Sequence, residues 1–225
     1  MDALILALVA IGPGVAWVWF FYRQDRYEPE PRHLIWRTFF FGMLAVLPAA
    51  ALELPFRTWM RAESGAFGLF VVSFLVVGVV EEGFKFLAAR ISVGRERAFN
   101  EPVDGIVYTV TAALGFAAVE NLLYLYSFGL RIAIFRAIVT YLAHASFSGL
   151  VGYYWGLSRF GDPSRRGGAV AARGLLAAIA LHGLYDFLLL GRLASPIFAL
   201  LLVYLVYRFV ARKIRETRDD SPFRP

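Results

Sequence analysis

The sequence predicts an all-α, polytopic integral membrane protein with about seven transmembrane helices. Of its 225 residues, 59% are hydrophobic and 16% aromatic, and the mean hydropathy of +0.61 exceeds that of a soluble globular domain of this size. The apolar residues also gather into runs of the length that crosses a bilayer as a helix, about 20 residues. No strand-like alternation competes with these runs, and an open sheet cannot satisfy its backbone in lipid.

Seven apolar segments meet the length requirement, and each is expected to form a helix. The first lacks a basic start and ends in WVWFFY instead of a small-residue cleavage site, so we expect a retained helix and not a signal peptide. Residues 1–225 are expected to form one domain with a short polar tail at 211–225. The expected helices are Ala3–Tyr22, Thr38–Leu54, Phe67–Ala88, Asp104–Tyr126, Ile132–Leu157, Val170–Leu190 and Ser195–Val210.

Arginine and lysine are distributed unevenly between the two sides of this expected bundle. The first, third and fifth connections and the C-terminal segment hold most of them. The other side holds Arg57, Arg61, Arg131, Arg136 and Arg192. The excess of positive charge predicts a cytoplasmic C-terminus and an N-terminus outside the cell membrane. The net charge of +6 is then explained by topology and by anionic lipid headgroups, and no nucleic-acid partner is expected.

Three charged residues, Glu81, Glu82 and Lys85, interrupt the apolar run VVGVVEEGFKFLAAR. A charge at the centre of a spanning helix costs about 2.5 to 3.5 kcal/mol, so three in one turn indicate a purpose. On a helix the lysine lies within reach of both carboxylates, because it follows them by four and three positions. Two carboxylates held together in low dielectric acquire different proton affinities, which suits general acid and base catalysis.

Polar residues also interrupt the next three expected helices. Glu120 and Asn121 lie in GFAAVENLLY, His144 lies in YLAHASFSGL, and His182 and Asp186 lie in LHGLYDFLL. His182 and Asp186 are one helical turn apart, a spacing that lets a carboxylate orient an imidazole. A single buried histidine usually bonds a neighbouring helix, but the combination on four consecutive helices favours a functional site.

The residue types limit the chemistry of this site. The chain has no cysteine and no HExxH, GxSxG or GxGD motif, which leaves carboxylates and imidazoles. A glutamate can activate water directly, or a metal such as zinc can lower the pKa of a bound water. Glu120, His144 and His182 would supply three metal ligands with an open fourth position, leaving Glu81 or Glu82 as the base. The sequence leaves both routes open.

The depth of Glu120 conflicts with a single site if its helix begins at Asp104. We therefore expect the fourth helix to begin near Val107, with NEPVDGI as a re-entrant or interfacial lead-in, because Pro102 and Gly105 favour an irregular backbone. The charged stretch DRYEPEPR before the second helix is equally compatible with a solvated loop and with a functional role.

Together these motifs resemble the PrsW family of intramembrane proteases. The resemblance rests on EEGFK, on FAAVE from Phe116 to Glu120 followed by Asn121, on His144, and on HGLYD from His182 to Asp186, preceded by DRYEPEP. It covers nearly the whole chain, and the ordered combination is far more specific than any single motif.

The resemblance implies site-one cleavage of a single-pass membrane protein, typically an anti-sigma factor, which a second intramembrane protease then processes. It also implies that Glu81, Glu82 and His182 belong to the active site. The related CAAX prenyl proteases carry EExxxR, FxxxH and HxxxN. Here Lys85 is closer than their arginine, Glu120 replaces their first histidine and Asp186 replaces their asparagine, so prenyl-protein processing is less expected.

We therefore expect a membrane endopeptidase in which Glu82 or Glu81 deprotonates water, and in which His144 and His182 stabilise the oxyanion or hold a metal. Lys85 and Asp186 would orient these groups, with Phe116 and Asn121 as neighbours. Its partners would be a single-pass membrane protein and membrane lipid. A transporter or ion channel using the same polar residues is the main alternative, and an inactive relative that only binds a membrane protein is another. The clustering on four helices, without an evident inverted repeat, favours the enzyme.

Overall fold

The chain folds into a bundle of long helices. The computed structural model describes residues 3–60, 65–163, 167–191 and 195–225, and within these ranges it contains helices and no strands. The elements are α1 (Ala3–Tyr22), α2 (Arg32–Glu53), the 3-10 helix η1 (Leu54–Met60), α3 (Gly65–Phe70), the π-helix η3 (Val71–Val77), α4 (Gly78–Val93), α5 (Pro102–Phe128), α6 (Leu130–Phe160), α7 (Gly168–Gly191) and α8 (Ile197–Asp219).

This architecture confirms the predicted polytopic membrane bundle. Among the described residues, four helical stretches are long and apolar enough to span a bilayer, and Leu6–Tyr22 is a shorter apolar helix. The four stretches are Arg32–Met60, Gly65–Val93, Pro102–Phe128 and Gly168–Gly191. The third expected helix is a compound rod in which α3, η3 and α4 follow one another without a break.

The start of α5 differs from the sequence prediction. The helix begins at Pro102 and runs unbroken to Phe128, so the expected start near Val107 with an irregular lead-in was wrong. Proline suits the first turn because its missing N–H needs no partner there. Asp104 Oδ2 accepts the backbone N–H groups of Asn100 and Glu101, each at 2.9 Å, and thereby caps the helix.

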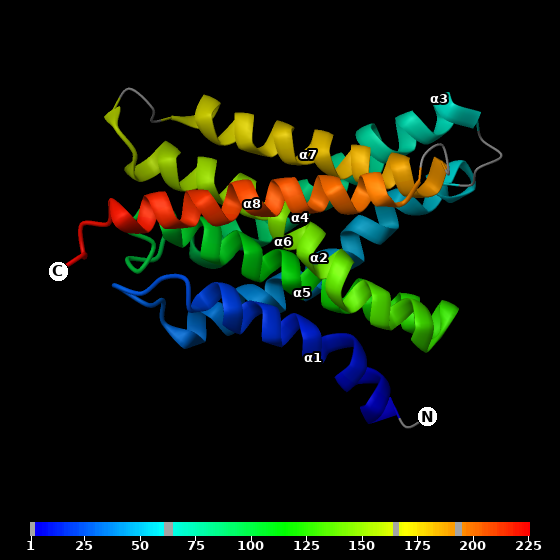
Figure 1. Cartoon of the computed structure of the whole chain (residues 1–225), viewed down its shortest axis with the longest axis horizontal. Helices are drawn as coiled ribbons and strands as arrows, with labels where there is room; N and C mark the ends of the chain where they lie inside the picture. The colour runs from blue at the N-terminus through cyan, green and yellow to red at the C-terminus, as the bar shows by residue number, and fades with distance from the viewer. Residues whose placement is uncertain (1–2, 61–64, 164–166, 192–194) are drawn as a thin grey trace.

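α5 lies at the centre of the bundle and is buried along most of its length. It packs against α6 on one side and against α1 and α2 on the other (Figure 1). The contact with α6 is close because glycines face each other: a Cβ at Gly105 would collide with the backbone of Gly152 and Gly156. The outer helices expose large apolar side chains such as Leu47 and Leu205, as expected for surfaces in contact with lipid.

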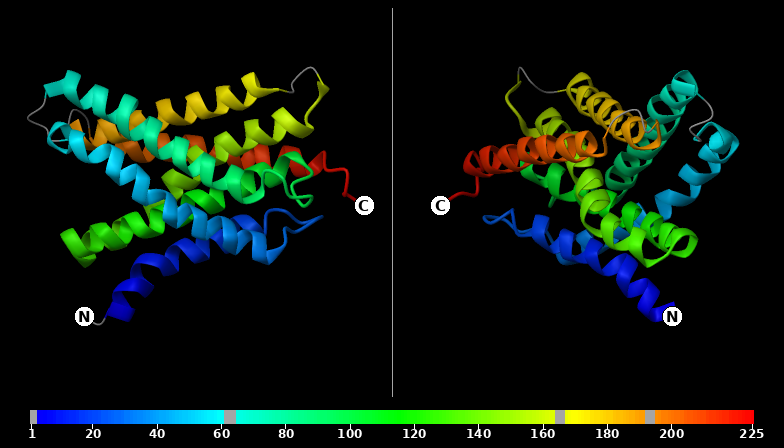
Figure 2. Two further views of the ribbon diagram at one scale, coloured as in Figure 1. Left: turned by 180° about the vertical axis from the view of Figure 1, so that it is seen from behind. Right: turned by 45° about the vertical axis from the view of Figure 1, so that its right-hand side comes forward.

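The two ends of the bundle carry the connections expected from seven passes. The loops from α1 to α2 and from α4 to α5 lie at the same end as the C-terminus, while α1 begins at the opposite end, near the turn between α5 and α6 (Figures 1 and 2). The basic connections therefore share an end. Of the arginines assigned to the other side, Arg61 and Arg192 lie outside the described residues.

Candidate active site

Lys85 is the centre of a polar cluster inside the bundle. Its Nζ lies 2.8 Å from Glu81 Oε2, 2.9 Å from Glu82 Oε1 and 2.8 Å from His144 Nδ1. The ammonium is fully buried, and its three protons meet three acceptors. Because lysine can only donate, Nδ1 of His144 accepts, and the proton of that imidazole is assigned to Nε2. The predicted contact of one lysine with both glutamates is confirmed.

Both carboxylate oxygens of Glu82 have hydrogen-bond partners. Besides Lys85, its Oε1 receives His182 Nδ1 at 2.8 Å, and its Oε2 receives the Ser148 hydroxyl at 2.8 Å. With both oxygens bonded and no exposed surface, Glu82 serves as a fixed anion. In the neutral form of His182, an Nδ1–H donated to Glu82 leaves Nε2 without a proton. That nitrogen lies 3.6 Å from Asp186 Oδ2 and 3.7 Å from Glu81 Oε2.

Glu81 differs from its neighbour. Its Oε2 bonds Lys85 and lies 3.9 Å from His144 Nδ1, and the residue retains 7% exposure. Across the part of the chain that the structure describes, its second oxygen has no hydrogen-bonded side chain. Glu81 is thus the member of the pair whose carboxylate stays open to a reacting group.

Glu120 joins the cluster from α5. Its Oε2 lies 2.9 Å from His144 Nε2, and its Oε1 forms an ion pair with Arg136 Nη2 at 2.8 Å. Oε2 is buried, and although the imidazole nitrogen lies close to it, the angle does not meet the geometry of a hydrogen bond. Arg136 Nε also donates to Asn121 Oδ1 at 2.7 Å. The Lys85 ammonium lies 4.7 Å from the centre of the Phe116 ring, a cation–π contact.

The structure therefore brings together the residues that the sequence singled out on α4, α5, α6 and α7. Local features of the backbone permit this. The π-helical η3 precedes α4, and π turns often occur where a helix must present functional side chains. Gly78 of α4 lies against α7, where an added Cβ would come within 2.9 Å of the Ile179 carbonyl.

Three further residues of the cluster were missed from the sequence. Arg136 was counted only as an arginine of the outer side, and Ser148 was not considered. Both lie on the face of α6 that carries His144, at spacings of eight and four residues, a pattern that could have revealed them. Glu53, at the end of α2, interacts electrostatically with Glu81, Glu120 and Asp186, and its buried Oε1 has no hydrogen-bond partner.

The cluster has the charge and the donors to bind a divalent metal. With every carboxyl ionised and the histidines neutral, Glu53, Glu81, Glu82, Glu120 and Asp186 carry five negative charges against the two positive charges of Lys85 and Arg136, a formal net charge of −3. Ligand atoms of Glu81, Glu120 and His144 lie within 4.8 Å of one another. Carboxylate oxygens and imidazole nitrogens are ligands that zinc accepts. The set predicted from the sequence contained His182 in place of Glu81, and His182 lies beside this group.

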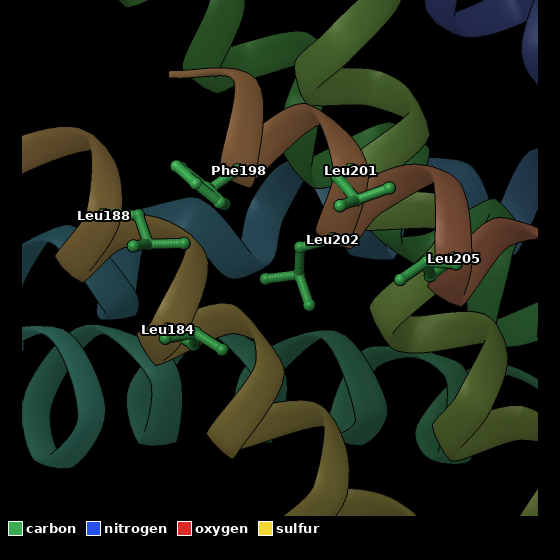
Figure 3. Close-up of a pocket in the computed structure, with 6 residues that line it drawn as sticks. All are labelled: Leu184, Leu188, Phe198, Leu201, Leu202 and Leu205. Carbon is green, nitrogen blue, oxygen red and sulfur yellow. The ribbon is translucent and has the colours of Figure 1, made fainter. Parts of the chain in front are cut away.

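An apolar groove between α7 and α8 is separate from the cluster. Leu184 and Leu188 of α7 face α8 there (Figure 3). Helical periodicity places His182 and Asp186 on the opposite side of α7. The α8 residues that line it are Phe198, Leu201, Leu202 and Leu205. With no polar lining residue, this groove is a lipid-facing surface and adds nothing to the chemistry.

Comparison with known proteins identifies the family of this chain. Residues 30–211 match the family described as PrsW family intramembrane metalloprotease. The chain is 35% identical to Protease PrsW of Bacillus subtilis (strain 168), over 97% of each protein. It is also 35% identical to Protease PrsW of Geobacillus kaustophilus, over 97% of this chain and 93% of the relative, and to that of Clostridioides difficile, over 92% and 86%. No solved structure matches. The chain therefore belongs to the PrsW family of intramembrane metalloproteases and is a membrane-embedded peptidase.

Proposed function

We propose that this peptidase cleaves a membrane-anchored protein with the buried Glu/His cluster of α4 to α7 as its active site. The observation that carries the proposal is the difference in hydrogen bonding between Glu81 and Glu82. Glu82 is saturated by Lys85, His182 and Ser148, whereas Glu81 keeps an open oxygen beside two imidazoles. A fixed anion next to an open carboxylate is the arrangement that general base catalysis requires.

In the proposed mechanism, Glu81 accepts a proton from the water that attacks the peptide carbonyl. Glu82 holds the imidazole of His182 by its Nδ1–H and keeps Nε2 free. Lys85 balances the charge of the two glutamates, so that the deprotonated base persists in the dry interior. Arg136 and Asn121 hold Glu120 against His144. Asp186 keeps the surroundings of His182 negative.

The metal implied by the family fits this cluster. Glu120, His144 and His182 would hold it: Oε2 of Glu120 is without a hydrogen bond, neutral His182 offers Nε2, and His144 would bind through Nε2 after release of the proton assigned there, since metal binding displaces protons. When bound, a zinc ion would lower the pKa of the attacking water and polarise the peptide carbonyl. With these three residues as ligands, Glu81 remains free to act as the base.

The proposed substrate is a single-pass membrane protein, with an anti-sigma factor cut at its first site as the leading candidate. Family membership supports this choice. The shared end of the basic connections supports an outward N-terminus and a cytoplasmic C-terminus. The substrate segment would have to unwind, because a peptide carbonyl within a helix is not accessible to attack.

A cleavage assay with parallel metal analysis tests the proposal. Wild type, Glu81→Gln and His182→Gln would be purified, loaded with zinc, and incubated in liposomes with a panel of single-pass proteins that includes anti-sigma factors. Glu216→Gln is the matched control, because Glu216 is an exposed glutamate of α8. We expect Glu81→Gln to retain the metal without cleaving, and His182→Gln to lose both.

Two results would contradict it. Loss of metal in Glu81→Gln, with metal retained in His182→Gln, would make Glu81 a ligand and remove it as the base. Full cleavage by Glu81→Gln, or ion flux through wild-type liposomes without any cleavage, would overturn the proposed active site and favour a transporter.

A further inference from the structure

A second acidic cluster lies at the end of the bundle that holds the C-terminus. Asp25 and Glu30, from the loop between α1 and α2, meet Asp104 in the first turn of α5, and ligand oxygens of the three carboxylates lie within 4.8 Å of one another. Asp25 and Glu30 are each 3% exposed and Asp104 is 1% exposed. The stretch DRYEPEPR is therefore not a fully solvated loop.

One oxygen of each carboxylate is fixed by the protein. Asp25 Oδ1 accepts the backbone N–H of Glu28, and Glu30 Oε2 accepts the Tyr108 hydroxyl. Asp104 Oδ2 caps α5. The remaining oxygens, Asp25 Oδ2 and Glu30 Oε1, are buried without any hydrogen-bond partner. Buried, unpartnered carboxylate oxygens are costly and indicate a missing positive ligand.

No protein cation supplies that positive charge. Among the residues that the structure describes, no lysine, arginine or histidine forms an ion pair with Asp25, Glu30 or Asp104. Burial, reinforced by Glu101, raises the pKa of Asp25 to about 6. Burial together with the neighbouring Asp104 raises the pKa of Glu30 to about 10. The cluster thus consists of three buried acids that no cation of the described residues balances.

We propose that Asp25, Glu30 and Asp104 form a binding site for a hard divalent cation, Ca²⁺ or Mg²⁺, separate from the active site. Three carboxylates without histidine or cysteine match the ligand preference of these ions, with waters completing the coordination. The ion would fasten the first loop to the start of α5. Asp104 and Glu120 belong to the same helix, sixteen residues and about 24 Å apart, so the two metal sites do not share ligands.

Terbium luminescence provides a direct test. Tb³⁺ substitutes for Ca²⁺ at oxygen sites and is excited through a nearby tyrosine, and Tyr108 bonds Glu30 directly. Detergent-purified full-length protein, stripped with chelator, would be titrated with Tb³⁺, and the bound ion then displaced by Ca²⁺, Mg²⁺ or Zn²⁺ in separate experiments. We expect saturable emission from one ion at Asp25, Glu30 and Asp104, distinct from any Tb³⁺ bound by the α4 to α7 cluster, and displacement of this ion by Ca²⁺ or Mg²⁺ would identify the preferred ion.

Variants locate the signal. Asp25→Asn and Glu30→Gln each keep the protein contact of the fixed oxygen and are expected to weaken Tb³⁺ binding about tenfold or more, because affinity follows the number of charged ligands. Glu28→Gln, in the same loop but outside the cluster, and Glu216→Gln, an exposed glutamate of α8, are expected to bind like wild type. Equal loss in Glu28→Gln or in Glu216→Gln would overturn the proposal, as would displacement by Zn²⁺ alone.

Thermal unfolding of the unmodified protein is a second measurement that does not depend on the folding of a variant. Ca²⁺ or Mg²⁺ is expected to raise the unfolding temperature of chelator-treated wild type. The rival is a shared proton between Glu30 and Asp104. In that case neither ion would stabilise the protein and acidification from about pH 8 to pH 5 would, because a protein whose carboxyls have raised pKa values in the folded state loses stability as pH rises. That result would overturn the cation site.

Discussion

The two acidic clusters of this protein bury similar groups and balance them in different ways. In the cluster of α4 to α7, Lys85 and Arg136 each form ion pairs with glutamates, although Glu53 Oε1 and Glu120 Oε2 are buried without a hydrogen bond. In the cluster of Asp25, Glu30 and Asp104, no cation of the described chain takes part, and two oxygens have no partner at all.

The difference separates two reasons for burying a carboxylate. An acid paired within the protein is part of a fixed arrangement, and removing any partner leaves the others uncompensated. An acid without a partner is destabilising by itself, and removing its charge relieves the protein unless an ion from solution is bound. The same substitution, glutamate to glutamine, is therefore expected to have opposite effects in the two places.

The largest effect is expected from Lys85→Met, which leaves two buried glutamates without their cation. We expect the free energy of unfolding to fall by about 3 to 5 kcal/mol and cleavage to be lost. Denaturation in detergent, followed by circular dichroism, measures the first, and a substrate assay the second. The chain's other lysine, Lys213, pairs with Glu216 at the surface, so Lys213→Met should change stability by no more than about 0.5 kcal/mol. Equal losses in both variants would contradict the central role of Lys85.

Glu82→Gln is expected to have the next largest effect. The amide carries no charge for Lys85 and cannot accept from both His182 and Ser148, which should destabilise the protein by about 2 to 3 kcal/mol. Comparison with Glu81→Gln in the same unfolding measurement sharpens the distinction between the glutamates. We expect Glu81→Gln to be the more stable of the two while cleaving no faster. A reversed order of stability would show that Glu82 is not the fixed member of the pair.

Ser148→Ala removes one hydrogen bond from Glu82 and is expected to cost about 1 to 2 kcal/mol, because the buried Oε2 loses the hydroxyl that donates to it. Ser146→Ala is the matched control: Ser146 is buried two positions away on α6, but its hydroxyl bonds the Leu142 carbonyl of its own helix. Cleavage rates of the two variants should differ in the same direction as their stabilities. Indistinguishable variants would remove Ser148 from the active-site network.

Glu30→Gln is expected to have the smallest effect and the opposite sign. In chelator at about pH 8, it should stabilise the protein by about 1 kcal/mol, because the pKa of Glu30 is raised on folding and its ionised form is disfavoured there. With Ca²⁺ or Mg²⁺ present the same variant should be less stable than wild type. Unfolding curves in chelator and in each ion measure both, with Glu28→Gln as control. If Glu30→Gln were less stable than wild type in chelator, the two clusters would not differ in the sign of the effect of a glutamate-to-glutamine substitution.

Local spacing was enough to predict the centre of the candidate site. The i, i+3 and i, i+4 relations of Glu81, Glu82 and Lys85 fix their shared face whatever the tertiary structure, and the structure shows the expected contacts. The seven apolar runs likewise predicted the bundle, because hydrophobic length alone defines a spanning helix.

Contacts between helices were harder to predict, because they depend on tilt and on where each helix begins. A helix start at Asp104 was expected to place Glu120 too far out to meet His144, but α5 starts at Pro102 and the two side chains still approach to 2.9 Å. Arg136 was counted as an arginine of the outer side. It lies near the start of α6, far along the chain from the other site residues, so its place on the same face of α6 as His144 was not recognised. Asp25 and Glu30 resembled a polar loop because burial by another helix end leaves no local pattern in the sequence.

The π-helical segment Val71–Val77 limits which insertions and deletions α3, η3 and α4 can accept. A π turn closes its hydrogen bond one residue later than an α turn, so this segment holds surplus chain without changing the direction of α4. If one residue were deleted from this segment, the π turn could convert to an α turn and the residues of α4 would keep their orientation. A residue inserted between Gly78 and Glu81 could not be accommodated in this way. It would rotate both glutamates by about 100° about the helix axis, away from α6 and α7.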